Sequence, residues 1–394
     1  MDSAPGSESD SHAGTAAGSG GGSGEPAAPV GAVRWREGRV VGVVRRWHGA
    51  VELDVLVEAA VTRALAYPAL VGTPQPGDRV LLNTSAHARG LGTGGFALVV
   101  AVPDRLPADP PDGPGHLVKA RYTPLQAMVL GVDEQESEHH ALMAAADDLA
   151  GAPVVVADLH SALPAVLAGV RDVDPGLRVA YVMTDGAALP AWFSRTVAGL
   201  RDAGWLIGCV TVGQAFGGDL EAVTVHTGLL ASRHVLGADV VVVAQGPGNL
   251  GSGTRWGFSG VAAGEAVNAA AVLGGRPVAS LRVSGADLRE RHHGVSHHSL
   301  TAYGRVALTP ADVVVPALVG PLGATVREQA AALGVPGGRH RLVEVGTEGL
   351  RAALDAVRPA TGVSLSTMGR GLDEDESAFR SAAPAGRHAA HLTR

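Results

Sequence analysis

Two hydrophobic periods divide the chain. Between residues 33 and 101, short stretches alternate apolar and polar residues, as in VRWREGRVVGVVRRWHGAVELDVLV at 33–57, with Gly38 and Gly49 at turn positions. Alternation with a period of two is typical of strands that bury one face. Because no helical pattern interrupts these strands, the sequence predicts a small all-β, barrel-like domain over residues 32–105.

The period changes beyond a proline-rich segment, PDRLPADPPDGPG at 103–115. Continuous apolar runs such as PVVVADLH and ADVVVVAQ then alternate with alanine- and leucine-rich stretches of helical length. Strands that are apolar on both faces and alternate with helices are typical of a parallel sheet covered on both sides. We therefore predict an α/β domain over residues 116–382, which a stiff linker at 106–115 joins to the barrel.

The α/β domain has eight strand candidates. A closed (β/α)8 barrel is one way to arrange eight strands. Their irregular spacing, and the long segments after residues 244 and 283, favour an open, mostly parallel, doubly wound sheet. The candidates are PVVVADLH, RVAYVMTD, WLIGCVTVGQ, ADVVVVAQ, RPVASLRVSG, ADVVVPALV, HRLVEV and GVSLSTMG. At the two ends of the chain, residues 1–31 predict a disordered tail rich in Gly, Ser and acids, and residues 383–394 predict a C-terminal tail.

Six motifs of the folded blocks resemble an uncharacterised bacterial family, common in actinobacteria, that is defined by a domain of unknown function. They are HLVKARYTPLQAMVLGVDEQES, VMTDGAALPAWFSRTV, GQAFGGDLEAVTVHTG, QGPGNLGSGTRWGFSG, SHHSLTAYGRV and STMGRGLDED. The resemblance covers about residues 33–385 and implies one shared architecture for both blocks. It implies no activity, because no activity is established for the family.

Composition narrows the class of protein. The formal net charge of −7 argues against general nucleic-acid binding, and no uncharged run is long enough to cross a membrane. The one cysteine, Cys209, excludes an internal disulfide framework and a cysteine zinc cage. Together with the lack of a signal-peptide pattern, this predicts a cytoplasmic location. Lys119 is the only lysine, and we expect it to be a solvated residue of the linker region.

The predicted barrel carries a basic and aromatic face that includes Trp35, Arg45, Arg46 and Trp47. Small barrels bind single-stranded nucleic acid by charge and stacking. In an acidic chain a solvated strand face, or a face that packs on the next domain, is the simpler interpretation. Binding of RNA or of another partner to the β domain stays an alternative.

Polar residues follow successive strands of the predicted sheet, at the edge where open parallel sheets bind ligands. The first strand is followed by Asp158 and His160, the second by Asp185, and the third by Gln214. Asp158 and His160 are two residues apart, which on an extended segment points both side chains the same way. That spacing suits a divalent metal or an acid–base pair. A helix cap explains either aspartate taken alone, but their repetition at strand ends favours one shared cleft.

A glycine-rich stretch, QGPGNLGSGTRWGFSG at 245–260, follows the fourth strand. Glycines expose backbone N–H groups, and a helix that begins near Ser259 adds its positive end. The stretch therefore predicts a cradle for a phosphate, carboxylate or nucleotide, with an irregular surface loop as the alternative. It contains no Walker motif and no convincing dinucleotide fingerprint. The predicted ligand-binding residues are Gly246, Gly248, Asn249, Gly251, Gly253, Thr254, Arg255 and Gln214, with Glu265 and Asn268 on the next helix.

Four histidines lie close together in SGADLRERHHGVSHHSLTAYGR at 284–305, which follows the fifth strand. We expect His292 and His293 to be loop residues, and we do not expect the adjacent His297 and His298 both to face one point. One of the latter pair, at a helix start, is a candidate general acid or base. His298 is also a candidate ligand of a divalent metal, together with Asp158 and His160.

These residues lead to two hypotheses. The first is an enzyme of hydrolase or transferase type that acts on a small anionic or phosphorylated molecule. In it, Asp158, His160, Asp185 and one of His297 or His298 provide acid–base or metal chemistry. The second is a non-catalytic metabolite sensor or assembly protein, whose β domain binds a partner or RNA. The sequence leaves open the cofactor, beyond a divalent metal, and the formation of homo-oligomers.

Overall fold

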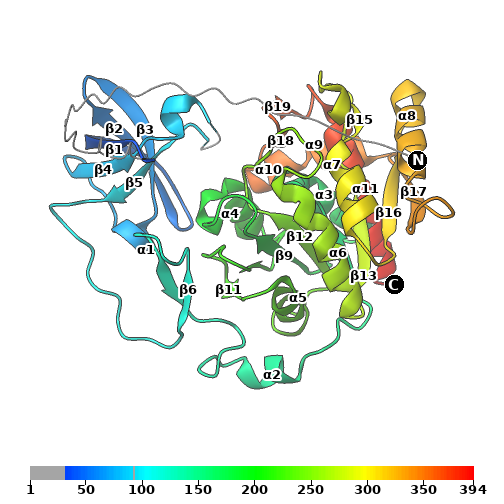
Figure 1. Cartoon of the computed structure of the whole chain (residues 1–394), viewed down its shortest axis with the longest axis horizontal. Coiled ribbons are helices and arrows are strands. Elements are labelled where there is room, and N and C mark those ends of the chain that lie inside the picture. The colour runs from blue at the N-terminus through cyan, green and yellow to red at the C-terminus, as the bar shows by residue number, and fades with distance from the viewer. Residues whose placement is uncertain (1–31, 92–93) are drawn as a thin grey trace, which may run out of the picture.

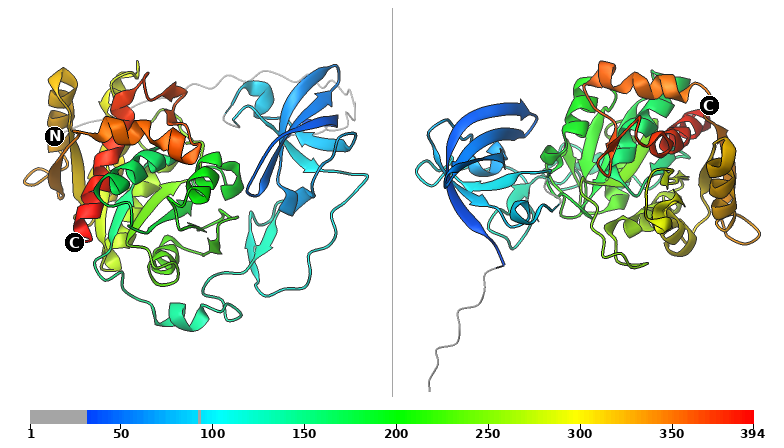
Figure 2. Two further views of the ribbon diagram at one scale, coloured as in Figure 1. Left: turned by 180° about the vertical axis from the view of Figure 1, so that it is seen from behind. Right: turned by 90° about the horizontal axis from the view of Figure 1, so that it is seen from above.

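Two folded blocks, a small β-barrel and a larger α/β domain, make up the structure (Figures 1 and 2). This computed structural model describes residues 32–91 and 94–394, so the tail predicted for residues 1–31 lies outside the described residues. Within the described ranges, no helix is long and apolar enough to cross a membrane.

The N-terminal block is a closed barrel with the strand order β1-β2-β3-β5-β4, which confirms the predicted β domain. Alternate side chains of its strands fill the interior, and Leu53 and Val55 on β2 are completely buried. The strands are β1 (Trp35–Trp47), β2 (Ala50–Val57), β3 (Ala60–Ala66), β4 (Arg79–Asn83) and β5 (Ala97–Ala101), with the short helices α1 (Pro68–Val71) and η1 (His87–Arg89) between them.

The α/β domain is built on an eight-stranded sheet in which every pairing is parallel. The sheet is open and doubly wound, as predicted, with the order β11-β10-β9-β12-β8-β13-β16-β17. The strands are β8 (Pro153–Val156), β9 (Val179–Thr184), β10 (Gly208–Thr211), β11 (Leu220–Glu221), β12 (Val240–Gln245), β13 (Arg276–Ser280), β16 (Asp312–Ala317) and β17 (Arg341–Gly346).

One predicted strand is wrong. The run GVSLSTMG contributes to a separate two-stranded hairpin, β18 (Ser366–Thr367) with β19 (Arg370–Gly371). Its Gly369 has a φ of 79°, which makes the turn of that hairpin. The edge of the main sheet is instead formed by β11, which has only two residues and so gives no periodic signal.

Helices cover both faces of the sheet (Figures 1 and 2). Strand residues alternate between two apolar cores, so that Val154 and Val156 contact one layer of helices and Val155 the other. The first layer contains α5 (Val225–His234), α6 (Ala262–Val272), α7 (His297–Thr301), η6 (Ala302–Val306) and α8 (Gly320–Ala331). The second contains α3 (Leu163–Val173), α4 (Arg195–Asp202), α9 (Leu350–Asp355), α10 (Val357–Thr361) and α11 (Glu376–Leu392).

The central strands send the chain to opposite faces of the sheet. β8 and β9 lead into α3 and α4 on one face, whereas β12 and β13 lead into α6 and α7 on the other. Because β9, β12, β8 and β13 are consecutive neighbours, the segments that follow them diverge in alternating directions. Crevices at such switch points are where open parallel sheets form their ligand sites.

The segment between barrel and sheet forms a hairpin, β6 (Leu117–Lys119) with β7 (Ala127–Val129), and the short helix α2 (His140–Ala145). Lys119 is not a solvated residue, as we expected, but is 2% exposed. Its ammonium donates to the carbonyls of Ala215 (3.0 Å) and Ala222 (2.8 Å) and lies 3.6 Å from Glu221 Oε2. These three oxygens offset the cost of burying the charge, and they fasten the hairpin to the edge of the sheet.

Trp192, in η3 (Ala191–Phe193), joins the barrel to the α/β domain. The indole N–H of Trp47 donates to Trp192 O at 2.7 Å, and the Trp192 ring lies against Gly49 of the barrel and Gly217 of the sheet domain. A Cβ at either glycine would overlap this ring. Trp47 therefore serves to pack the barrel on the next domain, which is one of the two simpler roles expected for the basic and aromatic face.

The predicted C-terminal tail, residues 383–394, is also wrong, because most of it forms the second half of α11. The small residues that made this segment resemble a tail allow α11 to pack very closely on α3. An added Cβ on Gly386 would lie 1.9 Å from Val166 O, and one on Gly169 would lie 1.9 Å from Ala383 O. The helix is therefore part of the core.

We expect replacement of Gly386 by alanine to destabilise the protein by about 1–3 kcal/mol, because the added methyl group overpacks the α3–α11 contact. In an exposed helix the same change would instead stabilise by up to about 1 kcal/mol. Urea unfolding followed by circular dichroism measures the difference. Gly42→Ala is the control, since nothing lies within 4 Å of its added Cβ. A Gly386→Ala variant as stable as this control would contradict the close helix contact.

Candidate functional site

Several of the polar residues predicted to follow the strands lie at the carboxyl ends of the central strands. Asp158 follows β8, Asp185 follows β9, and Gln245 ends β12. The side-chain amide of Gln245 donates to Asp158 O (2.7 Å) and to Asn249 Oδ1 (2.9 Å). Gly186 also adjoins this amide, because its added Cβ would lie 2.9 Å from Gln245 Oε1. The three strand ends and the start of the glycine-rich loop thus form one edge.

Unpaired polar atoms concentrate at this edge. Within the described residues, five buried side-chain atoms have no hydrogen-bond partner, and three of them are Asp158 Oδ2, Gln245 Oε1 and His297 Nε2. The other two, on Glu52 and Arg380, lie elsewhere. Buried polar atoms are nearly always paired in folded proteins. These three atoms, on segments that follow the central strands, make this region the candidate site.

Three histidines converge beside Asp158. His292 ends the short helix η5 (Glu290–His292), and His297 and His298 begin α7. Between β13 and α7, β14 (Val283–Ser284) pairs with β15 (Gly294–Val295), which folds η5 back toward the start of α7. One ring nitrogen of each histidine lies within 4.8 Å of those of the other two.

Two of our expectations fail at this cluster. His292 is not a solvated loop residue but is 4% exposed, whereas its neighbour His293 is exposed. The adjacent His297 and His298 both face His292, with ring centroids 5.0 and 4.9 Å from it. This geometry is available because the two residues lie at the first turn of a helix, where the chain has just changed direction, and not within a regular element.

The rings are held by their other contacts. His292 Nδ1 lies 2.8 Å from Ser296 Oγ, and His298 Nδ1 accepts a hydrogen bond from Arg282 Nη1 at 3.1 Å. The ring of Phe258 stacks on His298 with a centroid distance of 3.8 Å and an interplanar angle of 1°. These contacts leave one nitrogen on each of His292 and His298, and the unpaired Nε2 of His297, for a further partner.

The three imidazoles are neutral near pH 7. Burial, followed by the positive charge of Arg282, lowers the pKa of His292 to about 4 and that of His298 to about 3. Burial, followed by Arg291, lowers the pKa of His297. A neutral imidazole is the form that binds a metal ion, so protons do not compete for this cluster at neutral pH.

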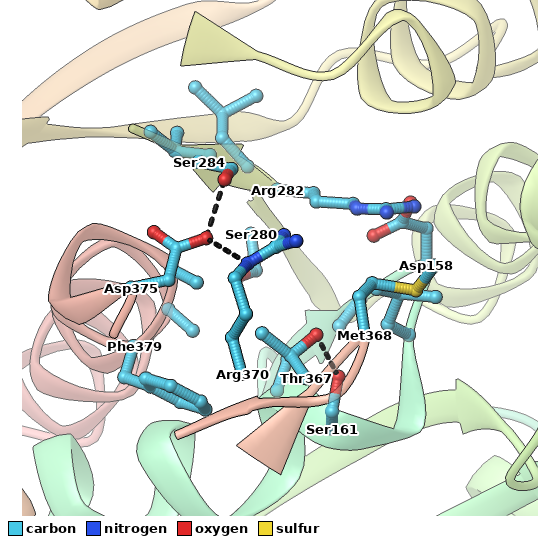
Figure 3. Close-up of a pocket in the computed structure, with 17 residues that line it drawn as sticks. Asp158, Ser161, Ser280, Arg282, Ser284, Thr367, Met368, Arg370, Asp375 and Phe379 are labelled. Atoms are coloured by element: carbon cyan, nitrogen blue, oxygen red, sulfur yellow. Dashed lines mark hydrogen bonds and ion pairs between the residues drawn. The ribbon is translucent and has the colours of Figure 1, made fainter. Parts of the chain in front are cut away.

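Asp158 and Arg282 line a small cavity (Figure 3), and both also lie close to His298. Asp158 is 3% exposed, and its Oδ2 lies 3.9 Å from His298 Nδ1 and 4.0 Å from Arg282 Nη1. Burial raises the pKa of Asp158, and the charge of Arg282 opposes this. The carboxylate therefore has charged and polar neighbours but no direct hydrogen bond through Oδ2.

The cavity in Figure 3 has a volume of about 30 Å³, enough for about two water molecules. Its walls carry two arginines, Arg282 and Arg370, and several hydroxyl groups. Asp375, at the start of α11, accepts from Ser284 Oγ at 2.5 Å and from Arg370 Nε at 3.3 Å. Arg370 is thus already paired, whereas Asp158 Oδ2 is a buried atom of this cavity without a hydrogen bond.

His160 does not join the histidine cluster. Its Nδ1 lies 3.1 Å from Tyr181 Oη and its Nε2 lies 2.8 Å from Ser194 Oγ, so neither nitrogen is free for a metal. The Tyr181 hydroxyl donates in turn to Gln245 O at 2.9 Å. His160, in η2 (His160–Ala162), is a buried link in a hydrogen-bond chain, and Asp158 faces different partners.

The glycine-rich loop is largely exposed from Gly251 to Trp256. Several of its backbone N–H groups already bond within the loop, such as Ser252 N to Gly257 O (2.7 Å) and Gly257 N to Thr254 Oγ1 (3.1 Å). They are not free to hold an anion. η4 (Ser259–Val261) starts the following helix close to the predicted position.

Other predicted ligand residues take different places. Arg255 lines a cleft of about 420 Å³ together with His297 and Arg305. Glu265 is exposed on α6, whereas Asn268 Oδ1 accepts from Leu308 N at 2.7 Å and so fixes the turn after η6. Asp185 and Gln214 line a separate cleft beneath the β6–β7 hairpin.

The family described as "Protein of unknown function (DUF3866)" matches residues 63–386. The chain belongs to this family. The DUF3866 match begins within β3 and ends within α11, so it contains the whole histidine cluster together with Asp158 and Arg282. This confirms the resemblance found in the motifs. No curated protein and no solved structure matches the chain.

We expect the free energy of unfolding to fall as the pH drops from about 6.5 to about 4. Unfolded histidine takes up a proton near pH 6.5, but in the fold burial lowers the pKa of His160 and His292 to about 4 and of His298 to about 3. The unfolded state therefore binds more protons in this interval, which favours it. Urea midpoints at pH 7.5, 6 and 5 measure the slope. His160→Gln should flatten it, and His293→Gln should not; equal slopes in both variants would exclude His160 as a source.

Proposed function

We propose that this chain is a metal-dependent enzyme of hydrolase type that acts on a small anionic compound, with His292, His297 and His298 as ligands of a divalent ion. The observation that carries the proposal is the convergence of three neutral imidazoles on one point beside a buried carboxylate. Three protein ligands leave a coordination position for water, which is the arrangement of catalytic zinc sites.

Zinc fits this donor set best. Tetrahedral zinc has Zn–N bonds of about 2.0–2.1 Å, so its nitrogen ligands lie about 3.3 Å apart. The three nitrogens lie within 4.8 Å of one another, and small side-chain rotations close this gap. Imidazole also suits nickel and copper, whereas magnesium and calcium prefer oxygen ligands. When bound, such an ion lowers the pKa of its water and so supplies a nucleophile.

Asp158 supports this site through His298. Histidine ligands of metals usually donate their second ring N–H to a carboxylate, which fixes the orientation of the ring. Oδ2 of Asp158 is buried, has no hydrogen bond, and lies 3.9 Å from Nδ1 of His298. In the present arrangement Nδ1 of His298 accepts from Arg282 at 3.1 Å. Metal binding at Nε2 would place the ring proton on Nδ1, turn that N–H toward Asp158, and release Arg282 to the substrate or to Asp158.

The anionic substrate is inferred from the cleft at His297. This cleft has a volume of about 420 Å³, within the range of about 300–1,000 Å³ typical of small-molecule sites. Arg255 and Arg305 line it, and both are exposed. Arginine binds carboxylates and phosphates through paired hydrogen bonds. The glycine-rich loop therefore contributes to anion binding through the Arg255 side chain, and we place the protein in the cytoplasm, where its buried Cys209 stays reduced.

We expect the purified chain to bind one equivalent of Zn²⁺ per molecule. His292→Ala and His298→Ala should each lower the affinity for zinc by more than about 100-fold, because even the loss of a group that only supports a ligand lowers metal affinity by about 10–100-fold. Competition with a chromophoric chelator measures the affinity. His293→Ala is the matched control, because this exposed neighbour lies outside the cluster. Equal zinc affinity in all four proteins would contradict the site.

Catalysis needs a separate measurement. The zinc-loaded protein should hydrolyse at least one member of a panel of phosphate monoesters, phosphate diesters and carboxylate-bearing esters or amides, and His298→Ala should not. Tight zinc binding with no turnover across the panel would favour the alternative, a metal-binding sensor without catalysis.

A further inference from the structure

A second cleft lies beneath the β6–β7 hairpin, at the carboxyl ends of β9 and β10. Its volume is about 550 Å³, again within the range of small-molecule sites. Asp185 and Gln214 line it from the sheet, and Arg121 and Tyr122 line it from the hairpin loop. None of these four residues belongs to the histidine cluster.

The hairpin loop holds two strained residues. Ala120 has a φ of 46° and Tyr122 a φ of 62°, which is unfavourable for residues other than glycine. Hydrogen bonds maintain this conformation: Arg121 N donates to Gln214 Oε1 at 3.2 Å, and Tyr122 N donates to Gln126 Oε1 at 2.9 Å. Strain that is held in this way concentrates at ligand-binding sites. Tyr122 lines the cleft and is 93% exposed.

The charged groups of the cleft have distinct roles. Lys119 anchors the hairpin with its ammonium and is buried, so it is not a ligand group. Arg121 is exposed and, within the described ranges, its guanidinium has no ion pair or hydrogen bond. Asp185 accepts from Gln214 N through Oδ2 at 2.8 Å, and Oδ1 is left for another donor. Gly213 permits this approach, because a Cβ there would overlap the Asp185 carboxylate.

We propose that this cleft binds a nucleoside mono- or diphosphate. The base stacks on Tyr122, as bases do on exposed aromatic side chains of nucleic-acid-binding proteins. The phosphate pairs with the guanidinium of Arg121. The ribose hydroxyls donate to the free oxygen of Asp185, in the way that an acidic residue at a strand end holds the ribose in dinucleotide-binding folds. This site goes beyond the proposed function and does not depend on a metal.

Isothermal titration of the full chain with AMP and ADP tests the site. Adenosine, which lacks the phosphate, and ribose 5-phosphate, which lacks the base, should each bind at least about 10-fold more weakly than AMP. Tyr122→Ala should lower the affinity for AMP by at least about 10-fold. Tyr122→Phe should keep the affinity of the parent, because stacking needs the ring and not the hydroxyl. Arg121→Ala should lower the affinity for AMP and leave the affinity for adenosine unchanged.

Two further variants distinguish this cleft from the rest of the hairpin surface and from the histidine cluster. Met128→Ala removes an exposed apolar side chain of the same hairpin that does not line the cleft, and it should leave AMP binding unchanged. His298→Ala, which removes the proposed metal ligand, should also leave it unchanged, so the two sites fail independently. The proposal is overturned if neither nucleotide binds, if Tyr122→Ala binds AMP as well as the parent, or if His298→Ala abolishes binding.

Discussion

A buried carboxylate that lacks a direct partner organises the centre of the α/β domain. Asp158 follows β8 and lies beside Arg282, which follows β13, and His298 of α7, and each distance is close to 4 Å. A charge removed from water must be offset by neighbours, and here the neighbours come from the next strand and from the helix that follows it. The position of the histidines therefore depends on the same crevice that buries Asp158.

The sheet order accounts for this crevice. β8 sends the chain to one face, and its neighbours β12 and β13 send it to the other, so the segments that follow these strands separate beyond β8. On the β12 side, the side-chain amide of Gln245 donates a hydrogen bond to the carbonyl of Asp158. Asp158 and Arg282 line the cavity in Figure 3, whereas the cleft at His297 is lined by other residues.

The sequence predicts what is local and misses what depends on tertiary packing. The valines of β12 define a buried strand because both faces of that strand are covered, and this pattern is visible in any short window. The burial of His292 depends on the β14–β15 pairing and on α7, and no neighbour in sequence reveals it. The alanine-rich end of α11 was predicted to be a tail but is buried. Its small residues indicate a close helix contact only when α3 is known to lie opposite. A useful local signal was available in HHGVSHH, where a glycine turn separates two histidine pairs and brings His292 against His297 and His298.

The contact between the barrel and Trp192 extends further than the domain boundary. Ser194 follows η3 and caps α4 through its Oγ, the same atom that lies 2.8 Å from His160. From His160 the hydrogen bonds continue through Tyr181 to the backbone of Gln245. The side-chain amide of Gln245 in turn donates to the carbonyl of Asp158. The barrel is therefore connected to Asp158 through a continuous series of contacts that begins at Trp192. Removal of the barrel would remove the Trp47–Trp192 hydrogen bond at the start of this series of contacts.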